Sequence, residues 1–278
     1  MMRMPAVTTV LLLFLAASTC SAQGGEDPVS APSAGSSPSR VAALTQDGTP
    51  AVPPFGVGER LTFEIGYGFI DAGTAVLGIP ELVEHEGRSC YRVLSVAESN
   101  AFISTFFPVR DVAESYLDAR DLISRRFEKS LREGDYRAHD LIEFDHDRQV
   151  AVYPDRKEVV PLAAEAQDIL SSLYTVRMED LEVGASVFIE NHADRRNYPL
   201  EILVLRKERV SVPAGRFDCV VVEPRMRGAG LFSHKGRLWV WLTDDELHLP
   251  VMMRSKVIIG SVSAELSAYT LADGASIE

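Results

Sequence analysis

Two tryptophans near the carboxyl-terminal end are the residues best suited to bind a ligand. Trp239 and Trp241 alternate along a strand-like run, with Arg237 on the same face and Lys235 just before it. Aromatic rings with cationic groups at their rim suit an acyl chain with an anionic head, or stacked sugar rings. The intervening residues are aliphatic, so both faces are apolar, as in a packed core strand. The run therefore predicts either a ligand-binding wall or a core strand.

A second apolar cluster lies in the segment Phe102-Ile-Ser-Thr-Phe-Phe-Pro108. Phe102, Phe106 and Phe107 crowd a short connection between two expected strands. Such a cluster either caps the sheet or serves as a lid or lipid-contacting loop, because exposed apolar patches usually mark interaction sites. We therefore include these three rings among the candidate ligand-binding residues.

Catalytic chemistry has no local signature in this chain. Gly-x-Ser-x-Gly is absent, and Gly260-Ser-Val-Ser263 predicts a hairpin rather than the strand-to-helix elbow of a serine hydrolase. Asp168 and Ser171 stand one helical turn apart, which favours a local hydrogen bond over half of a triad. A glycosidase needs two carboxylates across a cleft, and the 40 Asp and Glu residues identify no particular pair. We predict no catalytic residue, and the balance favours a non-enzymatic role.

Metal ligands are scattered as well. The six histidines, at positions 85, 139, 146, 192, 234 and 248, form no His-x-x-x-His motif. The chain also has no Cys-x-x-Cys motif. The acidic runs at 145–147 and 244–246 lack the spacing of a calcium-binding loop and predict solvated hairpin turns. We expect no metal and no cofactor.

The first 22 residues have the pattern of a secretory signal peptide. Arg3 precedes an apolar run over 10–17, small residues follow, and cleavage is expected after Ala22. The run is shorter than the roughly 20 residues that span a bilayer. Lipidation at Cys20 is disfavoured, because Ala17 and Thr19 stand where a lipoprotein signal has Leu and a small Gly, Ala or Ser. This predicts a periplasmic or outer-membrane-associated protein with no transmembrane span in the mature chain.

Cleavage there leaves Cys90 and Cys219. An oxidising compartment permits a disulfide between them, and closing so long a loop stabilises by roughly 4–5 kcal/mol in the chain-entropy model. Alternatively, each is a small buried hydrophobic residue in its strand. The sequence leaves both readings open.

Composition and charge narrow the class of protein. The 278 residues are 46% hydrophobic and 24% charged, which is typical of a globular chain. With 28 Lys and Arg against 40 Asp and Glu, the formal charge is −12. A chain this acidic, without a basic stripe, is a poor match for nucleic acid.

The pattern of elements predicts a mainly β fold. After a disordered Ser/Pro/Ala-rich tether over 23–54, a single β-rich domain is expected over 55–271, followed by a tail at 272–278. About a dozen short alternating runs predict a curved antiparallel sheet, either a half-barrel or a β-sandwich-like arrangement. Helical spacing of apolar residues predicts one central helix over about 162–178. In Val212-Pro-Ala-Gly215, the glycine predicts a tight turn with positive φ.

Several motifs together resemble one known family. In chain order they are Gly58-Glu-Arg-Leu-Thr-Phe63, Ala72-Gly-Thr-Ala75, Gln167-Asp-Ile-Leu-Ser-Ser-Leu-Tyr174, Val212-Pro-Ala-Gly-Arg-Phe-Asp-Cys219, Leu238-Trp-Val-Trp-Leu-Thr-Asp-Asp-Glu246, Leu249-Pro-Val251 and Ile259-Gly-Ser-Val-Ser-Ala-Glu-Leu266. The set resembles the bacterial envelope family named domain of unknown function 3108, over roughly 55–271. The resemblance implies a signal-bearing, periplasmic or outer-membrane-associated β domain, and it implies no reaction and no catalytic residues.

Three functions follow as expectations. The first is non-enzymatic binding of a hydrophobic or amphiphilic envelope component: a lipid, a lipoprotein or a glycolipid. The second is an enzyme or binder acting on polysaccharide, which requires an open groove with exposed aromatics and a close pair of carboxylates. The third is a structural module with envelope protein partners, which requires a large apolar patch or an unpaired edge strand.

Overall fold

The computed structural model describes residues 52–226, 237–256 and 260–272, and it places their strands in one antiparallel sheet of 14 strands. The order is β8-β7-β6-β5-β4-β3-β2-β1-β14-β13-β12-β11-β10-β9. The predicted mainly β, curved antiparallel fold is therefore confirmed. The predicted signal peptide, Lys235, nearly all of the tether and all but the first residue of the tail lie outside the described residues.

The strands in chain order are β1 (Arg60–Tyr67), β2 (Ile70–His85), β3 (Arg88–Ser99), β4 (Arg110–Asp118), β5 (Ser124–Glu133), β6 (Tyr136–Asp145), β7 (Val150–Tyr153), β8 (Glu158–Pro161), β9 (Ser186–Ala193), β10 (Arg196–Val212), β11 (Gly215–Met226), β12 (Arg237–Thr243), β13 (Pro250–Lys256) and β14 (Ser261–Thr270). The helices are α2 (Ala101–Ser104), the 3-10 turn η1 (Pro154–Arg156) and α3 (Ile169–Val176).

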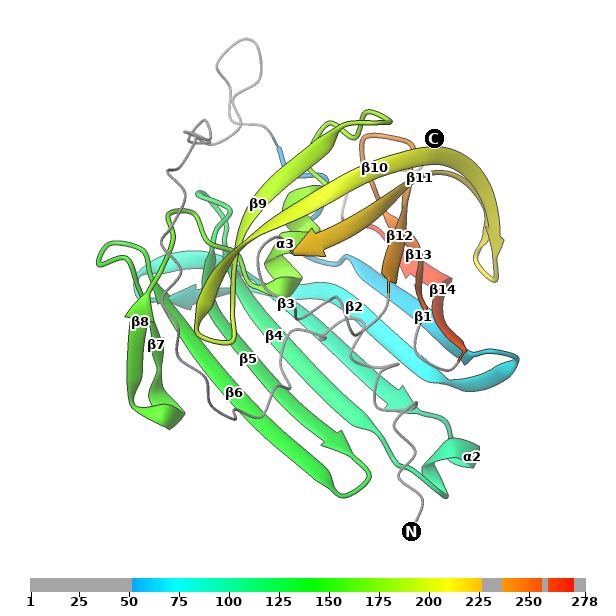
Figure 1. The fold of residues 1–278 in the computed structure, drawn as a ribbon, viewed down its shortest axis with the longest axis horizontal. Helices are drawn as coiled ribbons and strands as arrows, with labels where there is room; N and C mark the ends of the chain where they lie inside the picture. Colours follow the sequence, from blue (N-terminus) through cyan, green and yellow to red (C-terminus); the bar gives the residue numbers. More distant parts are fainter. Residues whose placement is uncertain (1–51, 227–236, 257–259, 273–278) are drawn as a thin grey trace, which may run out of the picture.

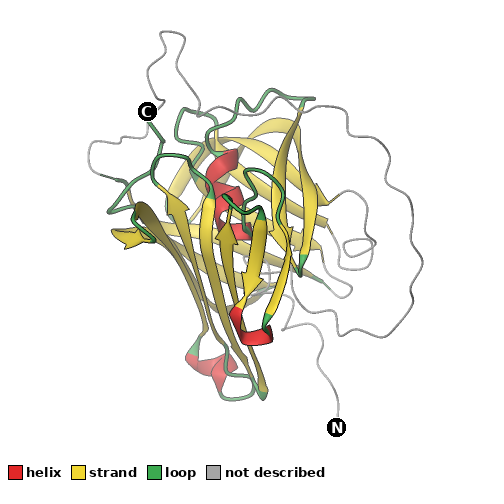
Figure 2. Cartoon of the chain, turned by 90° about the vertical axis from the view of Figure 1, so that its left-hand side faces the viewer, coloured by secondary structure: helices red, strands yellow, loops and turns green. Residues whose placement is uncertain are grey.

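Two meanders make up the sheet, and β1 joins them. Strands β1 to β8 follow one another side by side, as do β9 to β14, and β1 pairs with β14 to unite the two series. Alternation sets the inner face of β1, where Leu61, Phe63 and Ile65 are buried as predicted. The sheet curls around α3, which lies inside it (Figures 1 and 2).

The chain between β8 and α3 fastens the two ends of the curled sheet, and we call residues 162–168 the clasp. The Gln167 N–H donates to the Glu190 carbonyl, and the His192 N–H donates to the Gln167 carbonyl, each at 2.8 Å. At its other end, the Leu162 N–H donates to the Gln149 carbonyl at 2.8 Å. The clasp therefore bridges β7 and β9, which lie at opposite ends of the strand order.

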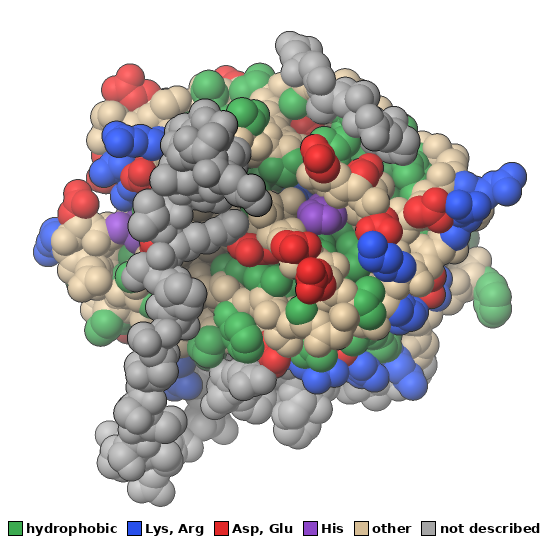
Figure 3. Space-filling view, turned by 90° about the horizontal axis from the view of Figure 1, so that it is seen from above, with side chains coloured by type: hydrophobic (Ala, Val, Ile, Leu, Met, Phe, Trp, Pro, Cys, Tyr) green, Lys and Arg blue, Asp and Glu red, His purple; other side chains and the backbone are tan. Residues whose placement is uncertain are grey.

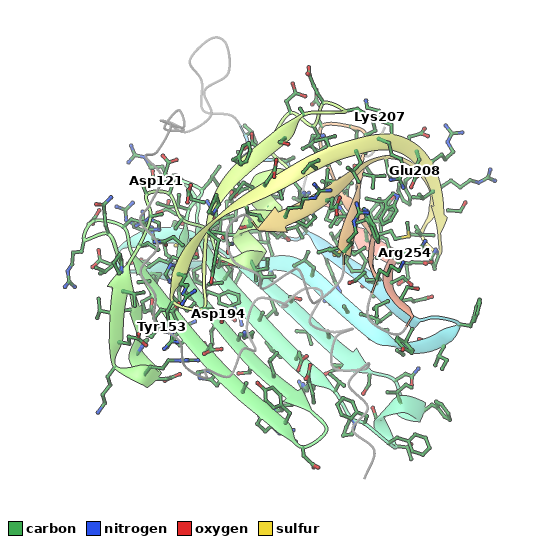
Figure 4. The ribbon with its side chains drawn as sticks, in the orientation of Figure 1. Asp121, Tyr153, Asp194, Lys207, Glu208 and Arg254 are labelled. Carbon is green, nitrogen blue, oxygen red and sulfur yellow. The ribbon has the colours of Figure 1, made fainter. Side chains whose placement is uncertain are left out.

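A buried side-chain network reinforces the clasp. His192 Nδ1 lies 2.7 Å from Asn197 Oδ1, and an amide oxygen only accepts, so Nδ1 carries the hydrogen. Nε2 therefore accepts from the Tyr153 hydroxyl at 2.9 Å, and that oxygen accepts the Arg195 N–H. Burial lowers the pKa of His192 and keeps its ring neutral. Figure 4 shows Tyr153 beside Asp194, in the turn between β9 and β10.

The central helix is shorter than predicted. The predicted start at 162 is wrong, because α3 begins at Ile169, and residues 162–168 form the clasp instead. Asp168 is the N-cap, and its carboxylate and the Ser171 hydroxyl form a reciprocal capping box. The predicted local bond between these two residues is thus confirmed. In the six residues before the cap, hydrogen bonding to the strand ends outweighs helix propensity.

A buried ion pair anchors the other end of α3. Arg177 donates to both carboxylate oxygens of Glu59 at 2.8 Å, and both side chains are 1% exposed. The Tyr174 hydroxyl donates to the same carboxylate at 3.1 Å. Gly78 lets the strands approach closely here, because a Cβ on it would lie 2.3 Å from the Glu59 carbonyl oxygen. The start of β1 and the end of α3 are thereby tied together.

Exchanging Glu59 for Gln is expected to lower the free energy of unfolding by about 3–5 kcal/mol, because Arg177 then keeps a buried, uncompensated charge. Urea unfolding at neutral pH measures the change. The matched control is Arg209→Ala, which removes an ion pair with Asp218 whose side chains are 68% and 63% exposed. That variant is expected to leave the free energy of unfolding nearly unchanged, because exposed ion pairs contribute little. Equal losses in the two variants would show that the buried pair is not the anchor.

Candidate functional site

An apolar cavity lies between α3 and the inner face of strands β10 to β13. Its volume is about 80 Å³, and it is partly open. Aliphatic side chains, a proline and a methionine form almost the whole wall, and Ser172 is the one polar residue in it. The lining residues are Ile169, Leu170, Ser172, Leu173, Val176, Leu200, Ile202, Val222, Pro224, Leu238, Val240, Leu242 and Met253.

Helical and strand periodicities both direct side chains into this cavity. Ile169, Leu173 and Val176 recur every three to four residues and share one face of α3. Across from them, Leu238 and Val240 point inward from β12 because alternate residues of a strand share a face. Ile169, Leu173 and Leu238 are only half-buried, so the cavity is partly reachable from outside.

The two tryptophans lie on the opposite face of β12 from the cavity. Trp241 is 4% exposed, and its Nε1 donates to Glu208 Oε1 at 2.6 Å. The Arg254 guanidinium lies 5.9 Å from its ring centre. Figure 4 places Glu208 and Arg254 near each other under the arc of β10. The aliphatic face of β12, and not the tryptophan face, therefore lines the cavity.

Trp239 also has a cationic partner. The Arg237 guanidinium lies 5.0 Å from its ring centre and makes two hydrogen bonds of 2.7 Å to Glu223. The structure thus brings Arg237 and Trp239 together, as expected from the sequence, and also engages both in contacts within the protein. Ligand binding by Arg237, Trp239 and Trp241 stays a prediction.

The three phenylalanines lie apart from the cavity. Phe102, on α2, is 68% exposed and Phe106 is 77% exposed, whereas Phe107 packs partly against the core. The segment contains a short helix, α2, that the sequence did not predict; the Asn100 side chain caps it by accepting the Ile103 N–H at 2.9 Å. None of the three rings lines the cavity.

Cys90 and Cys219 are both free and buried, so the disulfide that the sequence permits between them is not formed. They occupy β3 and β11, which are not neighbours in the sheet. Burial raises the pKa of the Cys90 thiol to about 11 and that of Cys219 to about 12. Both are therefore protonated, poor nucleophiles, as expected of small core residues.

The N-cap of α3, Asp168, is a buried carboxylate at the amino-terminal end of the helix. Asp168 accepts from the hydroxyls of Ser115 at 2.6 Å and Ser124 at 2.5 Å, and from the N–H groups of Leu170 and Ser171. Burial raises its pKa, although these four donors act in the opposite direction. The carboxylate is fully used in joining α3 to β4 and β5, which makes it a structural group.

A second buried acidic feature is the pair of Asp111 on β4 and Glu133 at the end of β5. The side chains are in contact, and they are 0% and 1% exposed. The Arg132 N–H donates to Asp111 Oδ1 at 2.9 Å, but no donor among the described residues reaches Asp111 Oδ2 or either Glu133 oxygen. Burial and then the Asp111 charge raise the pKa of Glu133 to about 8. The two carboxyls therefore share a proton near neutral pH.

Metal-binding groups do not gather in the part of the chain that the structure describes: no three His, Cys, Asp or Glu side chains are placed to hold an ion. Within residues 52–226, 237–256 and 260–272, no helix is long and apolar enough to cross a membrane. On the face seen from above, a group of acidic side chains lies near the centre, and acidic and basic side chains are both present toward the edges (Figure 3).

The sequence pointed to β12 as the wall of a binding site, and β12 does line a cavity, but the sequence did not identify the cavity or its lining residues. The available signal was the alternation of Leu238, Val240 and Leu242, together with the apolar spacing of α3. Nothing in the sequence showed that the apolar face of α3 meets the inner face of strands β10 to β13, because these segments are far apart in the chain.

Comparison with known proteins places the chain in a family. A family model described as protein of unknown function (DUF3108) matches residues 62–267. The chain is also similar to the crystal structure of a beta-barrel-like protein of domain of unknown function DUF1849 from Brucella abortus. The identity is 10%, the TM-score is 0.52, and the match covers 78% of this chain and 98% of that chain. This likeness concerns the fold.

Two further solved structures match at 12% identity over 78% of this chain. They are a candidate lipoprotein from Parabacteroides distasonis, covered to 98% with a TM-score of 0.35, and a candidate exported protein with a YmcC-like fold from Bacteroides fragilis, covered to 97% with a TM-score of 0.32. No curated protein sequence matches the chain.

Replacing Glu133 with Gln is expected to flatten the dependence of stability on pH. Because the folded-state pKa of about 8 exceeds the ordinary 4.5, the folded state binds more protons between these values. The stabilising contribution is therefore complete below about 4.5 and is lost as the pH rises toward about 8. Urea unfolding across this range measures the slope. Glu98→Gln, at a half-exposed glutamate, is the control and should show the same slope of stability against pH as the unmodified protein. An unaltered slope in Glu133→Gln would refute proton sharing.

Proposed function

Because the chain belongs to the DUF3108 family, whose description assigns no activity, we propose its function from the cavity itself. The protein binds an apolar or amphiphilic component of the cell envelope without catalysis. The end of an acyl chain enters between α3 and strands β10 to β13. The envelope location rests on the predicted signal peptide at residues 1–22.

The observation that carries this proposal is the composition of the cavity wall. Ser172 is its one polar lining residue, and the other lining residues are apolar. Such cavities remain dry and accept apolar guests, because a water molecule there would lack the two to four polar partners that it needs. The Ser172 hydroxyl already accepts from the Asn191 side-chain amide at 2.8 Å, so the wall lacks the several polar groups that would orient a sugar.

Cavity size limits what enters. A volume of about 80 Å³ is well above the ~10–15 Å³ that one water needs by a comparable measure, but below the ~300–1,000 Å³ of a pocket for a whole drug-sized ligand. We therefore propose that a few terminal methylenes are buried and that the head of the amphiphile stays outside. Burying each methylene contributes about 0.8 kcal/mol.

The polysaccharide alternative receives less support. It requires a close carboxylate pair in an open groove with exposed aromatic rings. Asp111 and Glu133 are close together but buried, and the rings of Trp239 and Trp241 already contact arginines. A buried carboxylate pair and rings already engaged by arginines do not form such a groove.

A cavity-filling exchange tests the proposal. Leu238→Trp places a larger side chain at a half-buried wall position and is expected to weaken binding of a fluorescent fatty acid by about tenfold. The reason is that excluding two methylenes costs ~1.6 kcal/mol. Fluorescence titration measures the dissociation constant, and thermal unfolding confirms that the variant is folded.

The matched control is Trp239→Leu, one residue along the strand on the opposite face. It is expected to bind the fatty acid as the unmodified protein does. Loss of binding in Trp239→Leu with retention in Leu238→Trp would place the site on the tryptophan face and overturn the proposal.

A further inference from the structure

Exposed apolar side chains gather at one end of the sheet, and we call this set the aromatic rim. Its members lie at the β1–β2 turn, the β3–β4 connection and the β5–β6 turn: Phe69, Ile70, Phe102, Phe106 and Tyr136. In an antiparallel meander, alternate connections fall at the same end, so the topology itself brings these three together. They lie at the lower and lower-right edge of Figure 1.

The rings of the aromatic rim project outward from the domain. Phe69 is fully exposed, and Phe102 and Phe106 are 68% and 77% exposed. The latter two meet each other edge to face, with centroids 5.8 Å apart. Three of the four exposed phenylalanines among the described residues belong to this rim. Such a concentration at one end marks an interaction surface.

Hydrogen bonds hold the three connections in place relative to one another. The Asn100 side-chain amide donates to the Asp71 carbonyl at 2.8 Å and ties α2 to the β1–β2 turn. The Gly134 N–H donates to the Pro108 carbonyl at 2.8 Å and ties the β5–β6 turn to the β3–β4 connection. Phe107 packs directly on Gly134, where an added Cβ would lie 2.8 Å from its ring. The exposed rings are therefore presented together on a fixed frame.

We propose that the aromatic rim inserts into the surface of a phospholipid bilayer, and that this docking does not require anionic lipid. The β1–β2 turn and α2 enter the boundary between headgroups and acyl chains. Phenylalanine is among the residues that anchor proteins in this layer, and tyrosine is enriched there because its ring is amphipathic.

Charge at the rim supports a bilayer of neutral headgroups. The exposed charged residues at these connections and the adjoining strand ends are three acidic and three basic: Asp71, Glu98, Asp135, Arg110, Arg132 and Arg137. Arg110 forms an ion pair with Glu98, and the Arg137 guanidinium donates to the carbonyls of Gly134 and Tyr136. Docking to anionic lipid uses clusters of Lys and Arg, each of which adds electrostatic attraction to the membrane surface. Acidic and basic residues are equal in number at the described rim, so it has no net positive charge, and the whole chain carries −12. Burial of the rings is therefore the driving force.

Shape and area favour a bilayer over a protein partner. A phenylalanine offers ~200 Å² of surface, so the three exposed rings present on the order of 500 Å². A stable protein interface buries about 800 Å² on each partner. Moreover, these rings stand on separate projecting connections, which a fluid bilayer accommodates without a complementary surface. The rim residues do not line the cavity, so the docking proposal can be correct or wrong independently of the cavity proposal.

Vesicle flotation tests the proposal on protein exported and processed in a bacterial host, with its N-terminus established by intact mass. The unmodified protein is expected to float with phosphatidylcholine vesicles, and no more strongly when phosphatidylglycerol is added. The variant Phe69→Ser/Phe102→Ser/Phe106→Ser is expected to lose flotation, with the partition coefficient falling about tenfold for each ring removed. Its fatty-acid affinity is expected to be unchanged, which separates the rim from the cavity.

Phe188→Ser is the matched control, because Phe188 is an exposed phenylalanine on β9, outside the rim. It is expected to float as the unmodified protein does. Flotation only with anionic vesicles, equal flotation of the triple variant, or no flotation of the unmodified protein would each overturn the proposal. Gel filtration supplies a further test, since a dimer that the triple variant dissociates would identify the rim as a protein interface and would also overturn it.

Discussion

The buried contact between Glu59 and Arg177 is the interaction on which the rest of the structure depends. It joins the first strand to the end of α3 across more than a hundred residues of chain, and both charges are removed from water. Such a pair gives little net stability but fixes one arrangement, because any other would leave a charge buried alone. At the other end of α3, Asp168 binds β4 and β5 through Ser115 and Ser124. The helix is therefore held at both ends inside the sheet.

The cavity follows from this fixation. A helix of only eight residues would not be stable by itself, so tertiary contacts must hold it. They keep Ile169 and Leu173 at a distance from β12 that leaves a partly open apolar space. Binding in this space and docking at the aromatic rim rest on different residues. Together the two proposals describe a protein that meets a lipid surface and holds part of a lipid.

Much of the fold was predictable because local alternation determines which residues face inward. The strands and the Pro213-Ala214 turn follow from this pattern, and Gly215 has the expected positive φ of 141°. The start of α3 and the short strand β8 were not predictable, because long-range pairing of the clasp determines them. For the candidate site, both faces of β12 were expected to be covered and the tryptophan face was the candidate wall, whereas its aliphatic face lines the cavity. Which face meets α3 depends on the curl of the sheet, which no local pattern encodes.

Native mass spectrometry of protein isolated gently after export tests the central claim most directly, when followed by solvent extraction and lipid analysis. The account predicts a bound amphiphile with an acyl chain, present in the unmodified protein and depleted when the cavity between α3 and β12 is filled. A mass equal to that of the polypeptide alone, with no recovery of binding when fatty acid is added, would contradict it.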